Sequence, residues 1–207
     1  MDKEAFFGTE PSVREKRRSA LLDTAEAVFL AKGYEAATVN DILAAANLSK
    51  GGFYHYFKSK AEVLDALRVR YTDWFLHTVE ARVNALPANA FKERFTTWVR
   101  AYVEAYLATY AVHDLVYHSV HAHRANEDRV AVTRSIEKLL EAGVADGTWR
   151  LHATAGLTAI IIYSAIHGVA DETIADRKDD LLGLSASLCA SLLLMLQPQQ
   201  ALSLIHI

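Results

Sequence analysis

The chain has 207 residues, of which 52% are hydrophobic and 23% are charged, and its formal net charge is −3. These values are ordinary for a globular protein with a sizeable core, and they argue against disorder and against a whole surface that binds polyanions. The single cysteine, Cys189, excludes an intramolecular disulfide and a cysteine-based zinc finger. Because the N-terminal residues also lack a secretory signal, we expect a cytoplasmic protein.

Two capping-box patterns mark the starts of the first two predicted helices. Ser12 and Glu15 stand three residues apart, as do Thr38 and Asp41, and such pairs satisfy backbone N–H groups at a helix start. The first pair predicts a helix over 13–32. The second pair predicts a short helix that begins after Thr38.

A tight turn and a third helix follow. Asn47 stands where the chain must reverse, and asparagine is the best residue after glycine for a left-handed position at a helix end. Ser49 can cap a new helix whose first turn, Lys50-Gly51-Gly52, is small or basic and therefore exposed. This order of elements predicts a helix-turn-helix, whose second helix enters the major groove of DNA.

These residues resemble the DNA-binding signature of TetR-family transcriptional regulators. The resemblance is carried by Thr38-Val39, by Ser49-Lys50-Gly51-Gly52 and by the run from Phe53 to Lys60. It departs from the family pattern in two places, since Asn47 replaces a glycine and Gly52 stands where many members carry threonine. The resemblance implies a helix-turn-helix DNA-binding domain over 12–60, followed by a larger helical domain over 61–200 for effector binding and dimerisation.

The residues predicted to contact DNA differ in whether their side chains can reach the bases or only the phosphates. Lys50 is the long side chain that can reach guanine O6 and N7, while the two glycines after it let the backbone approach the groove floor. Tyrosine, histidine and lysine around them can donate to phosphates, and Phe53 and Phe57 are assigned to the core. The residues predicted to contact double-stranded DNA are Thr38, Val39, Ser49, Lys50, Gly51, Gly52, Tyr54, His55, Tyr56 and Lys60.

The remainder of the chain is also predicted to be helical. Ser59 with Glu62 forms a third capping pattern, which opens a long helix that extends to about residue 84. Further helices are predicted over about 91–110, 113–123, 126–145, 153–175 and 178–196. No stretch has the period of a strand, so the fold is expected to be all-α.

An aromatic stripe in the second domain could line an effector pocket. Phenols and imidazoles in an apolar cavity can orient a ligand, although residue by residue the more common role of such side chains is to fill the core. The candidates are Trp98, Tyr102, Tyr106 and Tyr110, with Tyr117, His118, His121, Tyr163 and His167. A metal reading of His113, His118, His121 and His123 is disfavoured, because no cysteine or close acidic residue joins them. We therefore predict no metal and no cofactor.

The last two predicted helices are the most apolar. Each apolar run is shorter than the roughly 20 residues that cross a bilayer, and serines and a histidine interrupt them, so no membrane insertion is expected. The better reading is a helix pair that meets its own copy in a homodimer, as the resemblance also implies. The predicted interface residues are Leu157, Ile161, Ser164, Gly168, Leu181, Leu184, Leu188 and Leu192.

The sequence therefore predicts a ligand-responsive transcriptional repressor. One recognition helix reads only a few base pairs, so a homodimer on a palindromic operator is expected, with a small-molecule effector whose identity is open. An architectural DNA-binding protein without a ligand is the alternative. A helical enzyme with a Tyr/His pocket is less favoured, because the chain has no phosphate-binding glycine loop, nucleophile elbow or zinc motif, and no catalytic residue is assigned. Residues 202–207 resemble a translated adapter sequence and are left out of the fold prediction.

Overall fold

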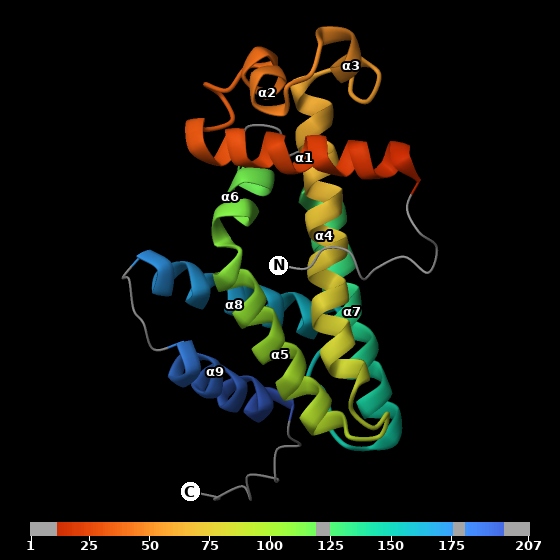
Figure 1. The fold of residues 1–207 in the computed structure, drawn as a ribbon. Helices are drawn as coiled ribbons and strands as arrows, with labels where there is room; N and C mark the ends of the chain where they lie inside the picture. The colour runs from red at the N-terminus through yellow and green to blue at the C-terminus, as the bar shows by residue number, and fades with distance from the viewer. Residues whose placement is uncertain (1–11, 119–124, 176–180, 197–207) are drawn as a thin grey trace, which may run out of the picture. The chain divides into compact units, whose positions relative to one another are not determined.

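The computed structural model describes residues 12–118, 125–175 and 181–196, and every regular element among them is a helix (Figure 1). In chain order the helices are α1 (Val13–Lys32), α2 (Val39–Ala46), α3 (Lys50–Tyr54), α4 (Lys60–Asn84), α5 (Phe91–Ala108), α6 (Tyr110–His118), α7 (Ala125–Asp146), α8 (Ala155–Ala175) and α9 (Leu181–Leu196). The predicted all-α fold is confirmed for these residues. The suspected foreign tail, 202–207, lies outside them.

The described residues form two compact units that divide within α4. Unit 1 contains residues 12–71 and 111–118, and unit 2 contains residues 72–110, 125–175 and 181–196. The sequence placed a boundary earlier, between residues 60 and 61. The first turns of α4 belong to unit 1 instead, where Val63, Leu64 and Leu67 are buried. The segment that contains α6 also joins unit 1, and in it the Tyr71 ring contacts His113 and Tyr117.

The core of unit 1 is built from apolar positions at helical spacing. α1 packs against α2 and buries one face, and α2, α3 and the start of α4 add further apolar side chains. The buried side chains of this core include Leu21, Leu22, Ala25, Phe29, Ile42, Phe53, Phe57, Val63, Leu64 and Leu67. Each large side chain of this kind contributes about 1.5–3 kcal/mol when it leaves water. This core holds the short α3 helix, which has too few turns to be stable alone.

The core of unit 2 is centred on α5. This helix packs against α7, α8 and α9, and α7 packs along α8. Its aromatic stripe is buried, with Trp98, Tyr102 and Tyr106 each less than 4% exposed. All three tryptophans of the chain, Trp74, Trp98 and Trp149, belong to unit 2.

The break between α5 and α6 lies at Thr109, earlier than the sequence indicated. The Thr109 hydroxyl donates to the Ala105 carbonyl at 2.6 Å, and its backbone N–H donates to the carbonyls of Ala105 and Tyr106. These bonds close α5 at Ala108. No glycine or proline marks this break, which is why the pattern predicted a continuous helix to residue 110.

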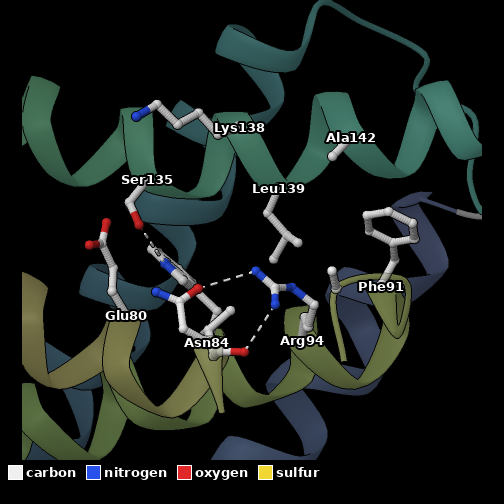
Figure 2. Close-up of a pocket in the computed structure, with 11 residues that line it drawn as sticks. Glu80, Asn84, Phe91, Arg94, Ser135, Lys138, Leu139 and Ala142 are labelled. Carbon is white, nitrogen blue, oxygen red and sulfur yellow. Dashed lines mark hydrogen bonds between the residues drawn. The ribbon is translucent and has the colours of Figure 1, made fainter. Parts of the chain in front are cut away.

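A cavity of about 260 Å³ opens in unit 2 between the end of α4, the start of α5 and α7. Figure 2 shows Arg94 inside it, with its guanidinium directed at the amide of Asn84, and Phe91 and Leu139 beside it. The cavity lies next to the aromatic stripe, because Trp98 belongs to both. It was not predicted from the sequence.

α8 is more apolar than the sequence reading suggested. By length and composition alone, its stretch Ala155–Ile174 is the one candidate among the described residues for a helix that could cross a membrane. Core helices of proteins outside membranes have the same composition. Only 33% of the most apolar window is buried within the chain, and Leu157, Ile160 and Ile161 of this helix are 40–51% exposed.

Candidate nucleic-acid interface

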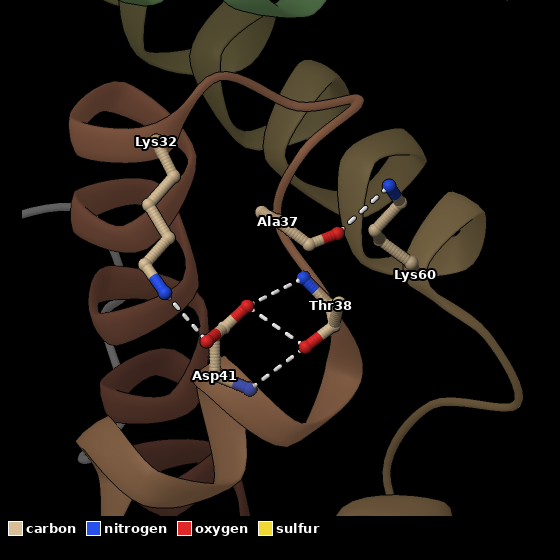
Figure 3. Close-up of polar contacts among 5 residues, drawn as sticks. All are labelled: Lys32, Ala37, Thr38, Asp41 and Lys60. Carbon is tan, nitrogen blue, oxygen red and sulfur yellow. Dashed lines mark hydrogen bonds and ion pairs between the residues drawn. The ribbon is translucent and has the colours of Figure 1, made fainter.

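The start of α2 is fixed by Thr38 and Asp41, as predicted (Figure 3). The Asp41 N–H donates to Thr38 Oγ1 at 3.2 Å, and Asp41 Oδ2 accepts from the Thr38 N–H at 2.9 Å. Lys32, in the last turn of α1, donates to Asp41 Oδ1 at 2.6 Å. The hydrogen bonds from Lys32 and then Thr38 lower the pKa of Asp41 to about 2. Asp41 thus joins the start of α2 to the end of α1.

The hydroxyl group of Thr38 takes part in this cap. Its Oγ1–H donates to Asp41 Oδ2 at 2.8 Å while the oxygen accepts from the Asp41 N–H. A phosphate at this helix end would therefore meet the backbone N–H groups of the first turn, which include that of the half-buried Val39.

The turn between α2 and α3 has the geometry predicted for it. Asn47 is left-handed, with φ 49° and ψ 47°, and the Leu48 N–H donates to the Leu43 carbonyl at 3.0 Å. Ser49 then caps α3, because its Oγ accepts from the Gly52 N–H at 3.2 Å. These local bonds set the direction in which α3 leaves the turn.

α3 has one buried and one exposed face. Phe53 is fully buried and Phe57 is 1% exposed, so both are core residues as predicted. Lys50, Gly51, Tyr54 and His55 are exposed, while Gly52 and Tyr56 are half-buried. The exposed face therefore carries one long cation, two aromatic donors and a stretch without side chains.

The two glycines of α3 are not required by the chain's own backbone or packing. Neither has a positive φ. A Cβ on Gly51 would meet no atom of the described residues within 4 Å, and one on Gly52 would lie 3.4 Å from Leu48 Cδ2 and Ser49 Oγ. Glycine inside a helix costs about 1 kcal/mol relative to alanine. A close approach by another molecule would account for this cost, as the groove of DNA requires.

Lys60, which was predicted to contact DNA, contacts the protein's own backbone in this structure. Its Nζ donates to the backbone carbonyls of Tyr34 (2.6 Å), Ala37 (2.9 Å) and Glu35 (3.3 Å), and it lies 4.3 Å from the centre of the Tyr34 ring. Three acceptors use the three donors of an ammonium group. In this structure Lys60 thus binds the start of α4 to the α1–α2 connection.

The third predicted capping box is only half formed. The Glu62 N–H donates to Ser59 Oγ at 3.1 Å, as expected. The Glu62 carboxylate reaches one residue further back, and accepts from the Lys58 N–H at 2.6 Å.

Sequence reasoning missed two contacts that order unit 1. The Arg18 guanidinium lies 4.9 Å from the centre of the Phe57 ring. Arg70 of α4 donates to Asp23 and Glu26 of α1, each at 2.8 Å. Asp23 and Glu26 stand three residues apart on one face of α1, which could have indicated a shared basic partner. That partner, Arg70, lies more than forty positions away in the sequence, so it could not be identified.

The predicted effector residues come together only in part. In unit 2, Tyr102 OH and His167 Nε2 share a hydrogen bond of 2.6 Å, and Tyr106 OH donates to Asp171 at 2.6 Å. Tyr163 packs on His167 with ring centres 4.3 Å apart, and burial raises the pKa of the Tyr163 hydroxyl. This cluster lies between α5 and α8, with its tyrosines of α5 buried and Asp171 exposed. Asp171 was missed, although it stands one turn after His167.

The other predicted effector residues lie elsewhere. Tyr117 belongs to unit 1, His118 ends α6, and His121 lies outside the described residues, as does His123. In the part of the chain that the structure describes, no group of three or more His, Cys, Asp or Glu side chains could hold a metal ion.

The predicted dimer residues divide between a free and a buried face. Leu157, Ile161, Ser164 and Gly168 of α8 are exposed. On α9, Leu188 and Leu192 are buried inside their own chain and Leu184 is half-buried, so the predicted α9 stripe packs within unit 2; Leu181 begins the helix. The exposed large side chains of α9 are instead Leu194 and Met195.

The chain matches a family model described as bacterial regulatory proteins, tetR family, over residues 21–67. It is 33% identical over 146 residues to the HTH-type transcriptional repressor KstR2 of Rhodococcus jostii, which covers 68% of this chain and 72% of that protein. KstR2 of Mycolicibacterium smegmatis is 31% identical over 150 residues, covering 68% and 71%. The fold is similar to that of the fatty acid degradation regulator FadR from Bacillus halodurans, with a TM-score of 0.75 at 21% identity over 89% of this chain and 97% of that one.

Proposed function

The chain belongs to the TetR family of bacterial regulatory proteins, and we propose that it is a ligand-responsive repressor acting as a homodimer in the cytoplasm. It is a DNA-binding transcriptional regulator. The repressor role follows the relatives named KstR2. The observation that carries the proposal is the exposed face of α3, where Lys50 stands beside two glycines that the protein's own packing does not need.

The α3 face supports reading of base edges in the major groove. A lysine at the start of a recognition helix can donate to guanine O6 and N7, and each good contact of this kind contributes about 1–3 kcal/mol of discrimination. Tyr54 and His55 flank it with donors that suit phosphates. Thr38, Val39, Ser49 and Tyr56 would complete the contact through backbone groups and side-chain edges.

A twofold dimer would supply both the second half-site reader and a cover for α8. Two α3 helices about 34–36 Å apart, or a multiple of that distance, would read a palindromic operator. Leu157, Ile160 and Ile161 of α8 are 40–51% exposed, and Leu194 of α9 is 69% exposed. An exposed apolar surface of this kind is typical of an interface between subunits.

The effector is proposed to act on unit 2 by population shift. A ligand that binds one arrangement of the dimer better than another lowers operator affinity by its differential binding energy. The part-buried pairs Tyr102–His167 and Tyr106–Asp171 join α5 to α8, so a ligand that enters this cluster would compete with one of them. α4 carries the chain from unit 1 into unit 2 and is the proposed route of the change.

Selection of preferred sequences from a random DNA duplex library tests this function. We expect a palindrome, bound with an affinity that falls steeply with salt. Lys50→Ala should weaken binding to that palindrome far more than to random DNA, while Lys58→Ala serves as the control for loss of one exposed charge. If no preferred sequence is recovered, an architectural protein is favoured. If the protein does not bind DNA at all, the enzyme alternative is favoured.

A further inference from the structure

We propose that the cavity between the end of α4, the start of α5 and α7 binds a small organic monoanion, whose carboxylate is held by Arg94 and whose aromatic body packs near Trp98. The assignment of this ligand as an effector rests on the proposed function. The binding itself does not.

Arg94 is a half-buried cation without a counter-charge. Its Nη1 donates to the carbonyls of Val83 (3.2 Å) and Leu86 (3.3 Å), and its Nη2 makes one long contact of 3.4 Å to Asn84 Oδ1. All three acceptors are neutral, and Arg94 forms no ion pair with any acid in the part of the chain that the structure describes. A partly buried charge of this kind is stabilised by a partner of opposite sign.

One edge of the guanidinium is incompletely used. The Arg94 Nε–H is buried and has no acceptor among the described residues. Nε and Nη2 form one side of the guanidinium fork, which binds the two oxygens of a carboxylate in parallel. The Asn84 amide lies at this edge, and the Leu139 side chain is close by (Figure 2). Asn84 is the exposed last residue of α4, so its side chain can turn away and let a carboxylate take its place.

The remaining walls suit a compact aromatic body. Trp98, Phe91 and Leu139 line the cavity, and its volume of about 260 Å³ is suited to a single-ring ligand. Lys138 lies at the rim, is exposed, and has no ion pair with a described residue, whereas Glu80 adds one negative charge. Two cations against one acid favour a ligand with a single negative charge.

The site is connected to α8 through the aromatic stripe. The Trp98 ring lies over Tyr102 with centres 5.1 Å apart, and Tyr102 holds His167 of α8. A ligand against Trp98 would therefore press on the contact between α5 and the helix proposed for the dimer.

A purely structural role for Arg94 is the competing explanation. Its bonds to Val83 and Leu86 satisfy carbonyls at the end of α4, where a cation is favourable to the helix dipole. That role predicts no ligand, and it predicts that the long contact to Asn84 has no consequence for binding. The two explanations differ in what Asn84→Asp does.

Phenylacetate is the probe, with phenylacetamide as its neutral match, and binding to the full chain is measured by ligand-observed NMR and calorimetry without DNA. We expect phenylacetate to bind at least tenfold more tightly than phenylacetamide. Asn84→Asp places a carboxylate of the protein on the open edge of Arg94 and should weaken the binding of phenylacetate at least tenfold. Asn40→Asp, the same change at an exposed position in unit 1, should leave binding unchanged, and Lys138→Gln should weaken it less than Asn84→Asp.

Equal binding of the acid and the amide, no binding of either, or equal binding to the wild type and to Asn84→Asp would each overturn this assignment. Operator affinity is measured separately, with and without phenylacetate. Absence of any sequence preference in the ligand-free protein would contradict the repressor function and leave the anion site standing. Failure of phenylacetate to bind would remove the site and leave the repressor function standing.

Discussion

The Nζ of Lys60 lies 4.3 Å from the centre of the Tyr34 ring and 2.6 Å from the Tyr34 carbonyl oxygen. One side chain at the first residue of α4 thus holds both the ring and the backbone of the segment that follows α1. The α1–α2 connection contains few residues and has no regular structure, so these contacts fix where α2 begins. The position of the recognition helix depends on them indirectly.

Replacement of Lys60 by glutamine should destabilise unit 1. Loss of hydrogen bonds from a charged, partly buried donor costs about 1–3 kcal/mol, measurable by urea unfolding. Lys58→Gln, which removes an exposed ammonium two residues away, should leave stability nearly unchanged. If Lys60 contacts a phosphate instead, its loss should reduce the salt slope of DNA binding by about 1, and a constant slope supports the internal role.

Gly51→Ala should separate stability from DNA affinity. Its Cβ meets no described atom within 4 Å and its φ is helical, so alanine should stabilise the folded chain by about 0.5–1 kcal/mol. The same methyl group would stand between the α3 backbone and the groove floor, and operator affinity should fall. A variant that gains stability and keeps full affinity would show that the backbone does not approach DNA here.

The Asp41 carboxylate should make stability depend on pH in acid. Its folded-state pKa of about 2 lies below the ordinary value of an aspartate, so its contribution is complete above about pH 4 and is lost as the pH falls through about 2. The free energy of unfolding of Asp41→Asn should approach that of the wild type over this interval. Glu141→Gln, which removes a carboxylate at an exposed position of α7, is the matched control.

A charge on the exposed face of α8 should separate the dimer. Ile161 is 40% exposed, and Ile161→Glu would place a carboxylate in the proposed interface, where burial without a partner is costly. Sedimentation should then give the mass of one chain. Leu30→Glu, at a leucine of α1 that is 45% exposed, is the matched control and should remain dimeric. If both variants remained dimeric, the interface would lie outside the exposed face of α8.

Local signals explain what could be predicted from the sequence. The caps at Ser12 and Thr38 and the left-handed Asn47 depend on residues within five positions of one another, so residue type and spacing were sufficient. α3 was placed correctly for the same reason. Phe53 of α3 and Phe57 just after it are both buried, as their spacing of four residues predicted.

The features that were not predicted concern contacts between distant residues and helices that are apolar all round. The contacts of Lys60 with the carbonyls near Tyr34 were not predicted, because no motif identifies these partners. α9 is so apolar that no period indicates which side faces inward, and the stripe that contains Leu188 and Leu192 proved to be the buried one. The cavity around Arg94 was missed because three helices must meet before its walls exist.

The placement of all three tryptophans in unit 2 gives the protein two separable optical signals. Unit 1 contains tyrosines, such as Tyr34 and Tyr54, but no tryptophan occurs in the chain outside unit 2. Indole fluorescence therefore reports on unit 2 alone, whereas far-ultraviolet circular dichroism records the helices of both units. Coincident unfolding curves would mean that the two units melt as one cooperative body, and displaced curves would reveal an intermediate in which one unit is folded and the other is not.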